Sequence, residues 1–249
     1  MLIAPKLDYN IFGLKIHKIF GNYMNSETIV ADKPSLNYNF SQFQPATWED
    51  YLNYDDNSHD ELSELKLFFN ENYLWWEMGY ESINHASVNR LFSMLFAAWL
   101  MRFPELKASD LGGCPMEKSP QKASVPDIIL YIGENAPMQE DYSTKIDLKK
   151  WRVPDLVGEV SDTTLATDLD HKKKIYADLG IPEYWVIDVQ SQRIIAFRFN
   201  EFGIYQQIDK SVALPGLSMS LIEETLRVLK NNNYRNANAA LWFAEKIKH

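Results

Sequence analysis

The chain has 249 residues, of which 46% are hydrophobic and 13% aromatic, and its formal net charge is −9. The aromatic content argues against a disordered chain, and the length fits one large domain or one domain with terminal extensions. The acidic balance argues against a protein that coats nucleic acid non-specifically, although bound divalent cations can reverse the charge of a surface locally.

The single cysteine, Cys114, allows no internal disulfide and no cysteine-based zinc site, which suits a reducing compartment. The first residues lack the basic-then-apolar order of a signal peptide. The longest apolar run, Leu95–Met101, is too short to cross a bilayer. We therefore expect a cytoplasmic protein without a membrane partner.

The first half of the chain predicts an extension followed by helices. Residues 1–58 show little periodicity, and we interpret them as an N-terminal extension packed on the core. Residues 60–69 space their apolar side chains as a helix would. A clearer helix is predicted from Val88 to Trp99, where apolar residues recur at three- and four-residue intervals. Residues 84–87 offer its N-cap, and Pro104 ends it.

The middle of the chain predicts strands. Residues 105–124 carry Gly, Pro, Ser and Lys and are predicted to form a loop. Two short apolar runs rich in β-branched residues, 125–132 and 154–160, are typical of buried strands. A helix capped by residues 167–170 is expected to end at Gly180.

The last part of the chain completes a mixed α/β (α+β) pattern. Strands at residues 183–188 and 193–199 are joined by a short turn and predict a hairpin. A last helix is expected near residues 222–229. We therefore expect a core domain over residues 59–230 and a polar, partly helical tail over residues 231–249.

Two acids, Asp127 and Glu159, stand within apolar strands, where charged side chains are rarely buried unless they are paired or bind a metal. If the two strands are neighbours, these carboxylates meet at one edge of the sheet. Two hard oxygen ligands there would suit Mg²⁺. Asp155 is a second candidate, because alternation along the strand puts it on the face of Glu159. An acid at a strand end is also often only a cap or an ion-pair partner.

The helix after Glu159 carries Lys172, Lys173 and Lys174, and Lys172 shares a helical face with Tyr176. An ammonium group near a metal ion can orient water and offset charge on a scissile phosphate. Three adjacent lysines are also typical of a solvated helix face, and the sequence leaves open which of them faces the acids.

Four further residues could take part in a site. Trp75 and Trp76 could stack on bases, although such a pair is more often core packing. His85 could act as a ligand or base, because imidazole titrates near neutrality, or as a helix cap. Glu81 could add a carboxylate to the same region.

Four stretches have a familiar order and spacing: Val125–Asp127, Val153–Ser161, Asp168–Tyr176 and Gly180–Asp188. Together they resemble the bacterial Uma-two family of restriction-endonuclease-like proteins, in the PD-(D/E)xK nuclease superfamily. The resemblance covers roughly residues 75–200, and its most specific part runs from Pro154 to Asp188. His85 also resembles the histidine that this family has before its second helix.

This resemblance implies a restriction-endonuclease-like fold, in which helices flank a mixed sheet and two strands each carry one acid. It matches these acids to Asp127 and Glu159. The usual lysine of the superfamily would stand two residues after the glutamate, where this chain has Ser161. The resemblance places a helical lysine at Lys172 instead.

The leading hypothesis is a DNA endonuclease that depends on Mg²⁺ or Mn²⁺, held by Asp127 and Glu159, with Lys172 positioning water or stabilising the transition state. Cutting both strands of a duplex would favour a homodimer. One alternative is an inactive nuclease fold that binds DNA or regulates a partner, which the acidic balance supports. Another is a metal-free hydrolase with paired carboxylates, as in glycosidases.

Overall fold

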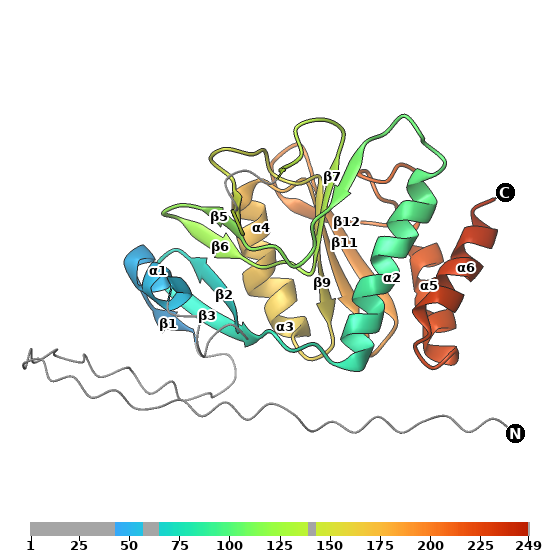
Figure 1. Ribbon diagram of the computed structural model, residues 1–249, viewed down its shortest axis with the longest axis horizontal. Coiled ribbons are helices and arrows are strands. Elements are labelled where there is room, and N and C mark those ends of the chain that lie inside the picture. The colour runs from blue at the N-terminus through green and yellow to red at the C-terminus, as the bar shows by residue number, and fades with distance from the viewer. Residues whose placement is uncertain (1–42, 57–64, 139–142, 249) are drawn as a thin grey trace, which may run out of the picture. The chain divides into compact units, whose positions relative to one another are not determined.

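Two β-sheets and the helices around them make up the part of the chain that the structure describes, a computed structural model of residues 43–56, 65–138 and 143–248 (Figure 1). All of these residues belong to one unit, residues 39–249. The predicted N-terminal extension lies outside the described residues except for residues 43–56.

The central sheet has the strand order β12-β11-β10-β9-β7-β4. Its strands are β4 (Ala108–Asp110), β7 (Ile128–Ile132), β9 (Leu156–Ser161), β10 (Glu183–Asp188), β11 (Arg193–Phe199) and β12 (Tyr205–Ile208). β9 and β10 run parallel, and the other neighbours are antiparallel. Because β9 and β10 are buried on both faces, they read in the sequence as nearly continuous apolar runs. The predicted mixed α/β class is confirmed.

The second sheet has the strand order β1-β3-β2-β6-β5-β8. Its strands are β1 (Gln44–Pro45), β2 (Leu65–Asn70), β3 (Tyr73–Met78), β5 (Met116–Lys118), β6 (Lys122–Ser124) and β8 (Ile146–Asp147). Helix α1 (Trp48–Asp56) packs on it, with the rings of Trp48 and Phe69 5.4 Å apart. Trp75 and Trp76 of β3 are only 2% and 8% exposed, so the expected core packing of this pair is confirmed.

Helices cover both faces of the central sheet (Figure 1). One face carries α2 (Ile83–Leu100), α5 (Met219–Asn231) and α6 (Asn236–Lys246). The other face carries α3 (Leu165–Thr167), the π-helical turn η2 (Asp168–Lys172) and α4 (Lys173–Leu179). Within the described ranges, we find no helix with both the length and the apolar character that a membrane span requires.

The C-terminal helix α6 contributes to the core. Ala239 and Phe243 of α6 are fully buried, and the ring of Phe243 lies 6.4 Å from that of Trp99 on α2. The segment expected to be a tail therefore packs against the helical layer. The boundaries of the three predicted regions stay a prediction.

The predicted helix over residues 60–69 is wrong where the structure describes it, because Leu65–Asn70 is strand β2. β2 forms a hairpin with β3, and the turn residues Glu71 and Asn72 have positive φ angles of 48° and 70°. β2 buries apolar side chains on both faces, which hides the two-residue period of a strand. Residues 60–64 lie outside the described residues.

Three smaller expectations also need correction. The predicted loop over residues 105–124 contains β4, β5 and β6, which are too short to show a period. Ser82, not residues 84–87, caps α2, because its Oγ accepts a hydrogen bond from the backbone N–H of His85 at 3.1 Å. The helix expected to end at Gly180 is interrupted by η2, although Gly180 does end it, in a left-handed conformation with φ 79°.

We predict that Phe92→Ala lowers the free energy of unfolding by about 3–5 kcal/mol, because Phe92 of α2 is buried and its ring packs against Trp185 of β10. Met94→Ala on the same helix is the matched control, because Met94 is 38% exposed and should change stability by about 0.5 kcal/mol or less. Urea unfolding of both variants gives the comparison. Equal losses would contradict the packing of α2 on the sheet.

Candidate functional site

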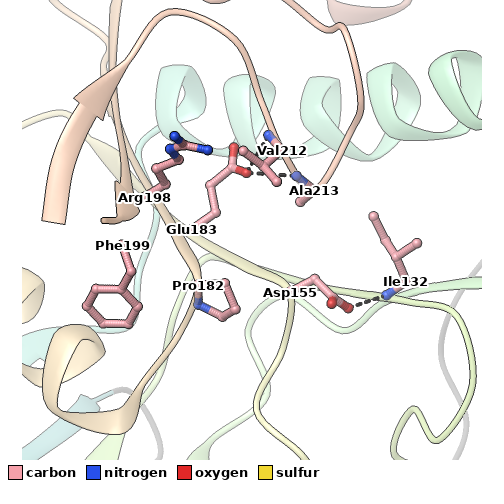
Figure 2. A pocket seen from close by; sticks show the side chains of 8 residues that line it. All are labelled: Ile132, Asp155, Pro182, Glu183, Arg198, Phe199, Val212 and Ala213. Atoms are coloured by element: carbon pink, nitrogen blue, oxygen red, sulfur yellow. Dashed lines mark hydrogen bonds between the residues drawn. The ribbon is translucent and has the colours of Figure 1, made fainter. Parts of the chain in front are cut away.

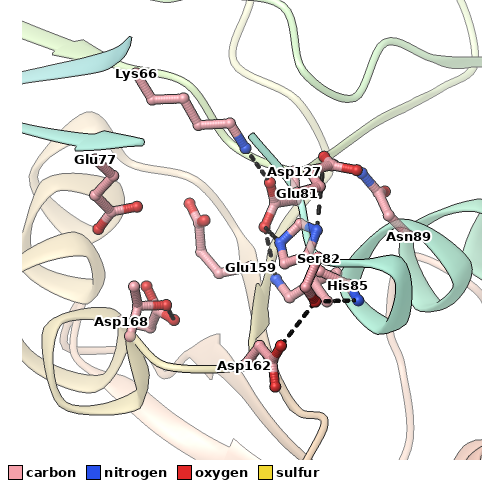
Figure 3. Close-up of polar contacts among 12 residues, drawn as sticks. Lys66, Glu77, Glu81, Ser82, His85, Asn89, Asp127, Glu159, Asp162 and Asp168 are labelled. Carbon is pink, nitrogen blue, oxygen red and sulfur yellow. Dashed lines mark hydrogen bonds and ion pairs between the residues drawn. The ribbon is translucent and has the colours of Figure 1, made fainter. Parts of the chain in front are cut away.

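Asp127 lies immediately before β7, and three elements hold its carboxylate (Figure 3). The backbone N–H of Val160 on β9 donates to Oδ2 at 2.8 Å. Nε2 of His85, in the first turn of α2, lies 3.1 Å from the same oxygen. Nζ of Lys66 on β2 lies 2.5 Å from Oδ1. With 4% exposure, Asp127 is a buried acid whose position depends on both sheets and on α2.

Glu159 lies on β9 beside Asp127. The antiparallel register pairs Ile128 with Gly158, so the next position along each strand brings Asp127 and Glu159 together. Oε2 of Glu159 lies 3.1 Å from Nζ of Lys172, and Oε1 accepts a hydrogen bond from the hydroxyl of Tyr176. Glu159 is only 2% exposed. The register therefore brings the two carboxylates together as expected, but on the interior strands β7 and β9 and not at an edge of the sheet.

Lys172 is the member of the lysine triplet that faces the acids. Its Nζ lies 2.8 Å from Glu77 Oε2 and 2.9 Å from Asp168 Oδ1, in addition to its contact with Glu159. Lys173 instead places its ammonium over the ring of Phe197, and Lys174 pairs with the exposed Glu71. Asp168 and Lys172 are the first and last residues of η2, and both are buried. π-Helical turns are often found at functional sites.

Three residues of this cluster were missed in the sequence: Lys66, Glu77 and Asp168. Lys66 and Glu77 are directly opposite each other in the β2–β3 hairpin. The signal that could have found them is the turn at residues 70–72, between two runs of strand-forming residues. Asp168 carried a weaker signal, because it stands four residues before Lys172 on what looks like one helix.

Glu81 and His85 lie at the edge of the same cluster. Ligand atoms of Glu81, His85 and Asp127 all lie within 4.8 Å of one another. Nδ1 of His85 is 3.6 Å from Glu81 Oε1, while Nε2 faces Asp127. Ser82 fixes the start of α2 and also donates a hydrogen bond to Asp162 at 2.8 Å. His85 is thus held in the first helical turn and faces an acid on each side.

Asp155 is not brought to this cluster, although alternation puts it on the face of Glu159. It lies before the first residue of β9, and its Oδ2 accepts hydrogen bonds from the N–H of Ile132 at 2.6 Å and from Arg152 at 2.9 Å (Figure 2). There it lines a separate cavity of about 320 Å³ with Glu183 and Arg198 among its neighbours. The structure therefore gives Asp155 an ion-pair role at the opposite end of β9.

The charges around Asp127 keep it ionised. Burial disfavours the carboxylate, but the hydrogen bond from His85 and the charge of Lys66 outweigh burial, so the pKa of Asp127 lies well below its usual range. The same contacts act on their partners. Burial opposes a charged imidazole, yet the hydrogen bond and charge of Asp127 raise the pKa of His85. The pKa of Lys66 is likewise raised, because the charge of Asp127 outweighs burial.

The acids around Lys172 outnumber its positive charge. Burial raises the pKa of Glu159 to about 8, and the charge of Asp127 adds to this effect while Lys172 opposes it. Burial also raises the pKa of Glu77, against the charge of Lys172. Lys172 stays protonated, since the charges of its acidic neighbours outweigh burial and hold its pKa well above the usual value. The cluster thus carries a surplus of acid.

Fold and site together define a mixed α/β protein that gathers carboxylates and lysines beside the interior strands β7 and β9 of its central sheet. The chain belongs to the Uma2 family, described as "Putative restriction endonuclease", and the match covers residues 48–230. The family resemblance seen in the sequence is confirmed. Membership in this family supports a nuclease role.

One solved structure is similar to this chain over most of its length. It is the crystal structure of "a putative nuclease belonging to DUF820 from Anabaena variabilis ATCC 29413", at 16% sequence identity and a TM-score of 0.49. The similarity covers 73% of this chain and 99% of that one. No curated protein matches the sequence.

We predict that Glu159→Gln stabilises the metal-free protein at alkaline pH and not at acid pH. The pKa of Glu159 is about 8 in the folded protein and about 4.3 in an unfolded chain, so the wild type loses stability as the pH rises through this interval. The glutamine of the variant does not ionise, so its free energy of unfolding does not fall in this way. We expect a gain of roughly 2–4 kcal/mol at about pH 9 and little gain at about pH 4.

Urea unfolding in EDTA across this pH range measures the effect. Glu201→Gln is the control, because Glu201 is exposed and lies outside the cluster. A difference between Glu159→Gln and the wild type that stays constant with pH would contradict the raised pKa.

Proposed function

We propose that the protein is a metal-dependent endonuclease that hydrolyses phosphodiester bonds of DNA. The observation that carries this proposal is the convergence of Asp127 and Glu159, two buried acids on neighbouring strands, each in contact with a lysine. Membership in a family described as restriction endonucleases supports the same reaction class. A nuclease needs oxygen ligands for a cation and positive charge near the phosphate, and these acids and their lysines supply both.

The donor set fits Mg²⁺ or Mn²⁺. Asp127 and Glu159 offer hard carboxylate oxygens, and Glu81 and His85 extend the set around Asp127. Among the described residues, the permanent cations paired with Glu77, Asp127, Glu159 and Asp168 are Lys66 and Lys172, which leaves a surplus of acid that a divalent cation would neutralise. When bound, such a cation polarises a phosphoryl oxygen and lowers the pKa of a bound water.

The protein's own groups would orient this chemistry. The N–H of Val160 and the ring of His85 fix Oδ2 of Asp127, and the hydroxyl of Tyr176 fixes Oε1 of Glu159. Lys172 would place its ammonium toward the phosphate, where it offsets the charge that develops in the transition state. Ion pairs to Glu77 and Asp168 already fix the position of this ammonium, so little reorganisation would be needed.

A second candidate function is an inactive nuclease fold that binds DNA or regulates a partner. The ion pairs of Asp127 and Glu159 with lysines favour it, because they satisfy both acids without a metal. The metal-free hydrolase also stays a candidate, since one carboxyl of raised pKa is what that mechanism requires. Activity that resists EDTA would identify it. The homodimer and the cytoplasmic location stay predictions.

We predict that Glu159→Ala abolishes both Mn²⁺ binding in calorimetry and Mg²⁺-dependent DNA cleavage, while circular dichroism shows an intact fold. Asp155→Asn is the matched control, because this acid lies before β9 and outside the cluster. It should bind Mn²⁺ and cleave like the wild type. Wild-type protein that binds no Mn²⁺ would favour the inactive fold, and full activity in Glu159→Ala would contradict the assignment.

The lysine triplet provides a second comparison. We predict that Lys172→Met lowers kcat by about 10²–10³-fold, because the buried ammonium is lost from the acids that orient it. Lys174→Met should keep wild-type kcat, since Lys174 is exposed and pairs with Glu71. DNA cleavage at saturating Mg²⁺ measures both. Equal kcat values in the two variants would exclude Lys172 from the reaction.

A further inference from the structure

Lys66 reaches the site from the second sheet. It lies on β2, next to residues of the same strand that pack in the core, and its side chain is only 18% exposed. Nζ of Lys66 lies 2.5 Å from Oδ1 of Asp127 (Figure 3). Lys66 is therefore a second lysine at the acids, partly buried and paired with Asp127, whereas Lys172 pairs with Glu159, Glu77 and Asp168.

The two oxygens of Asp127 are held in different ways. Oδ2 is bound by the backbone N–H of Val160, within a buried strand, and by His85, within the first turn of a helix. Oδ1 is bound by an ammonium at the end of four methylene groups, which can swing aside without moving the backbone. Oδ1 is therefore the oxygen that a metal ion would take first.

A divalent cation at Oδ1 and the ammonium of Lys66 repel each other, because like charges a few ångströms apart in a partly buried site are poorly screened. The two cations compete for one carboxylate oxygen.

We propose that Lys66 occupies, in the metal-free protein, the place at Asp127 that a divalent cation would take, and that its ammonium would turn toward the substrate phosphate once that place is filled. This inference rests on the proposed function. Lys66 thus weakens metal binding and assists the reaction, two effects of opposite sign. A lysine with only a structural role would stabilise the fold without weakening metal binding.

The first test is calorimetric titration with Mn²⁺ alone, in the absence of DNA. Lys66→Gln removes the charge and can still donate a hydrogen bond to Asp127, so the fold keeps its contact. Lys66→Met removes both, and Lys66→Arg keeps the charge. We expect Mn²⁺ affinity to rise at least about tenfold in the Gln and Met variants and to stay near the wild-type value in the Arg variant.

Lys122→Met is the matched control. Lys122 is also a buried lysine of the second sheet, 7% exposed, and it pairs with Asn70 and Asp178 outside the cluster. Its removal should leave Mn²⁺ affinity unchanged. Unchanged or weaker Mn²⁺ binding in both neutral Lys66 variants would overturn the proposal.

The second test is DNA cleavage at saturating Mn²⁺, where metal affinity no longer limits the rate. We expect kcat of Lys66→Gln to fall by about 10²-fold, with partial activity kept in Lys66→Arg. A wild-type kcat in Lys66→Gln would overturn the displacement toward phosphate. A different result would contradict the proposed nuclease function itself. In that case the wild-type protein would neither bind Mn²⁺ through Glu159 nor cleave DNA.

Discussion

The hydrogen bond from the backbone N–H of Val160 to Asp127 is the contact on which the site depends. This bond joins Asp127, which precedes β7, to β9, the strand that carries Glu159. The distance between the two carboxylates and their orientation are thereby fixed. The same strand pairs with β10 on its other side and is buried on both faces. A rigid, buried strand therefore supports both carboxylates.

Burying that many charges costs free energy unless each is paired. Two lysines pair with the acids: Lys66 of the second sheet contacts Asp127, and Lys172 of η2 contacts Glu159. The acids still outnumber the lysines. Burial and the charge of Asp127 therefore raise the pKa of Glu159. A divalent cation would offset part of this acid surplus, which is why the composition of the site is consistent with the proposed metal dependence.

Much of the fold could be predicted from periodicity. The apolar spacing of α2 and the runs of β7, β9, β10 and β11 indicated these elements because each buries a regular pattern of side chains. Strand β2 could not be identified this way, since it is apolar on both faces. β4, β5 and β6 are short and depend on partners distant in the sequence, which local propensity does not report.

The acids Asp127 and Glu159 were predictable for the same reason, because a charge within an apolar strand stands out. Lys172 was predicted through the family resemblance, and only the structure distinguishes it from its neighbours Lys173 and Lys174. Lys66 and Glu77 were hidden by the incorrect helix over residues 60–69. Cross-strand pairing decides their role, and a pairing becomes visible only once the hairpin is known.

The hairpin also sets the order in which the site can assemble during folding. The contact of Lys66 with Asp127 joins residues 61 positions apart, and that of Lys172 with Glu77 joins residues 95 positions apart. Contacts of such long range form late, because the loops between them must close first. Both lysines can pair with the acids only after the hairpin and η2 have formed. A partly folded chain that lacks either element would therefore leave some of these acids unpaired.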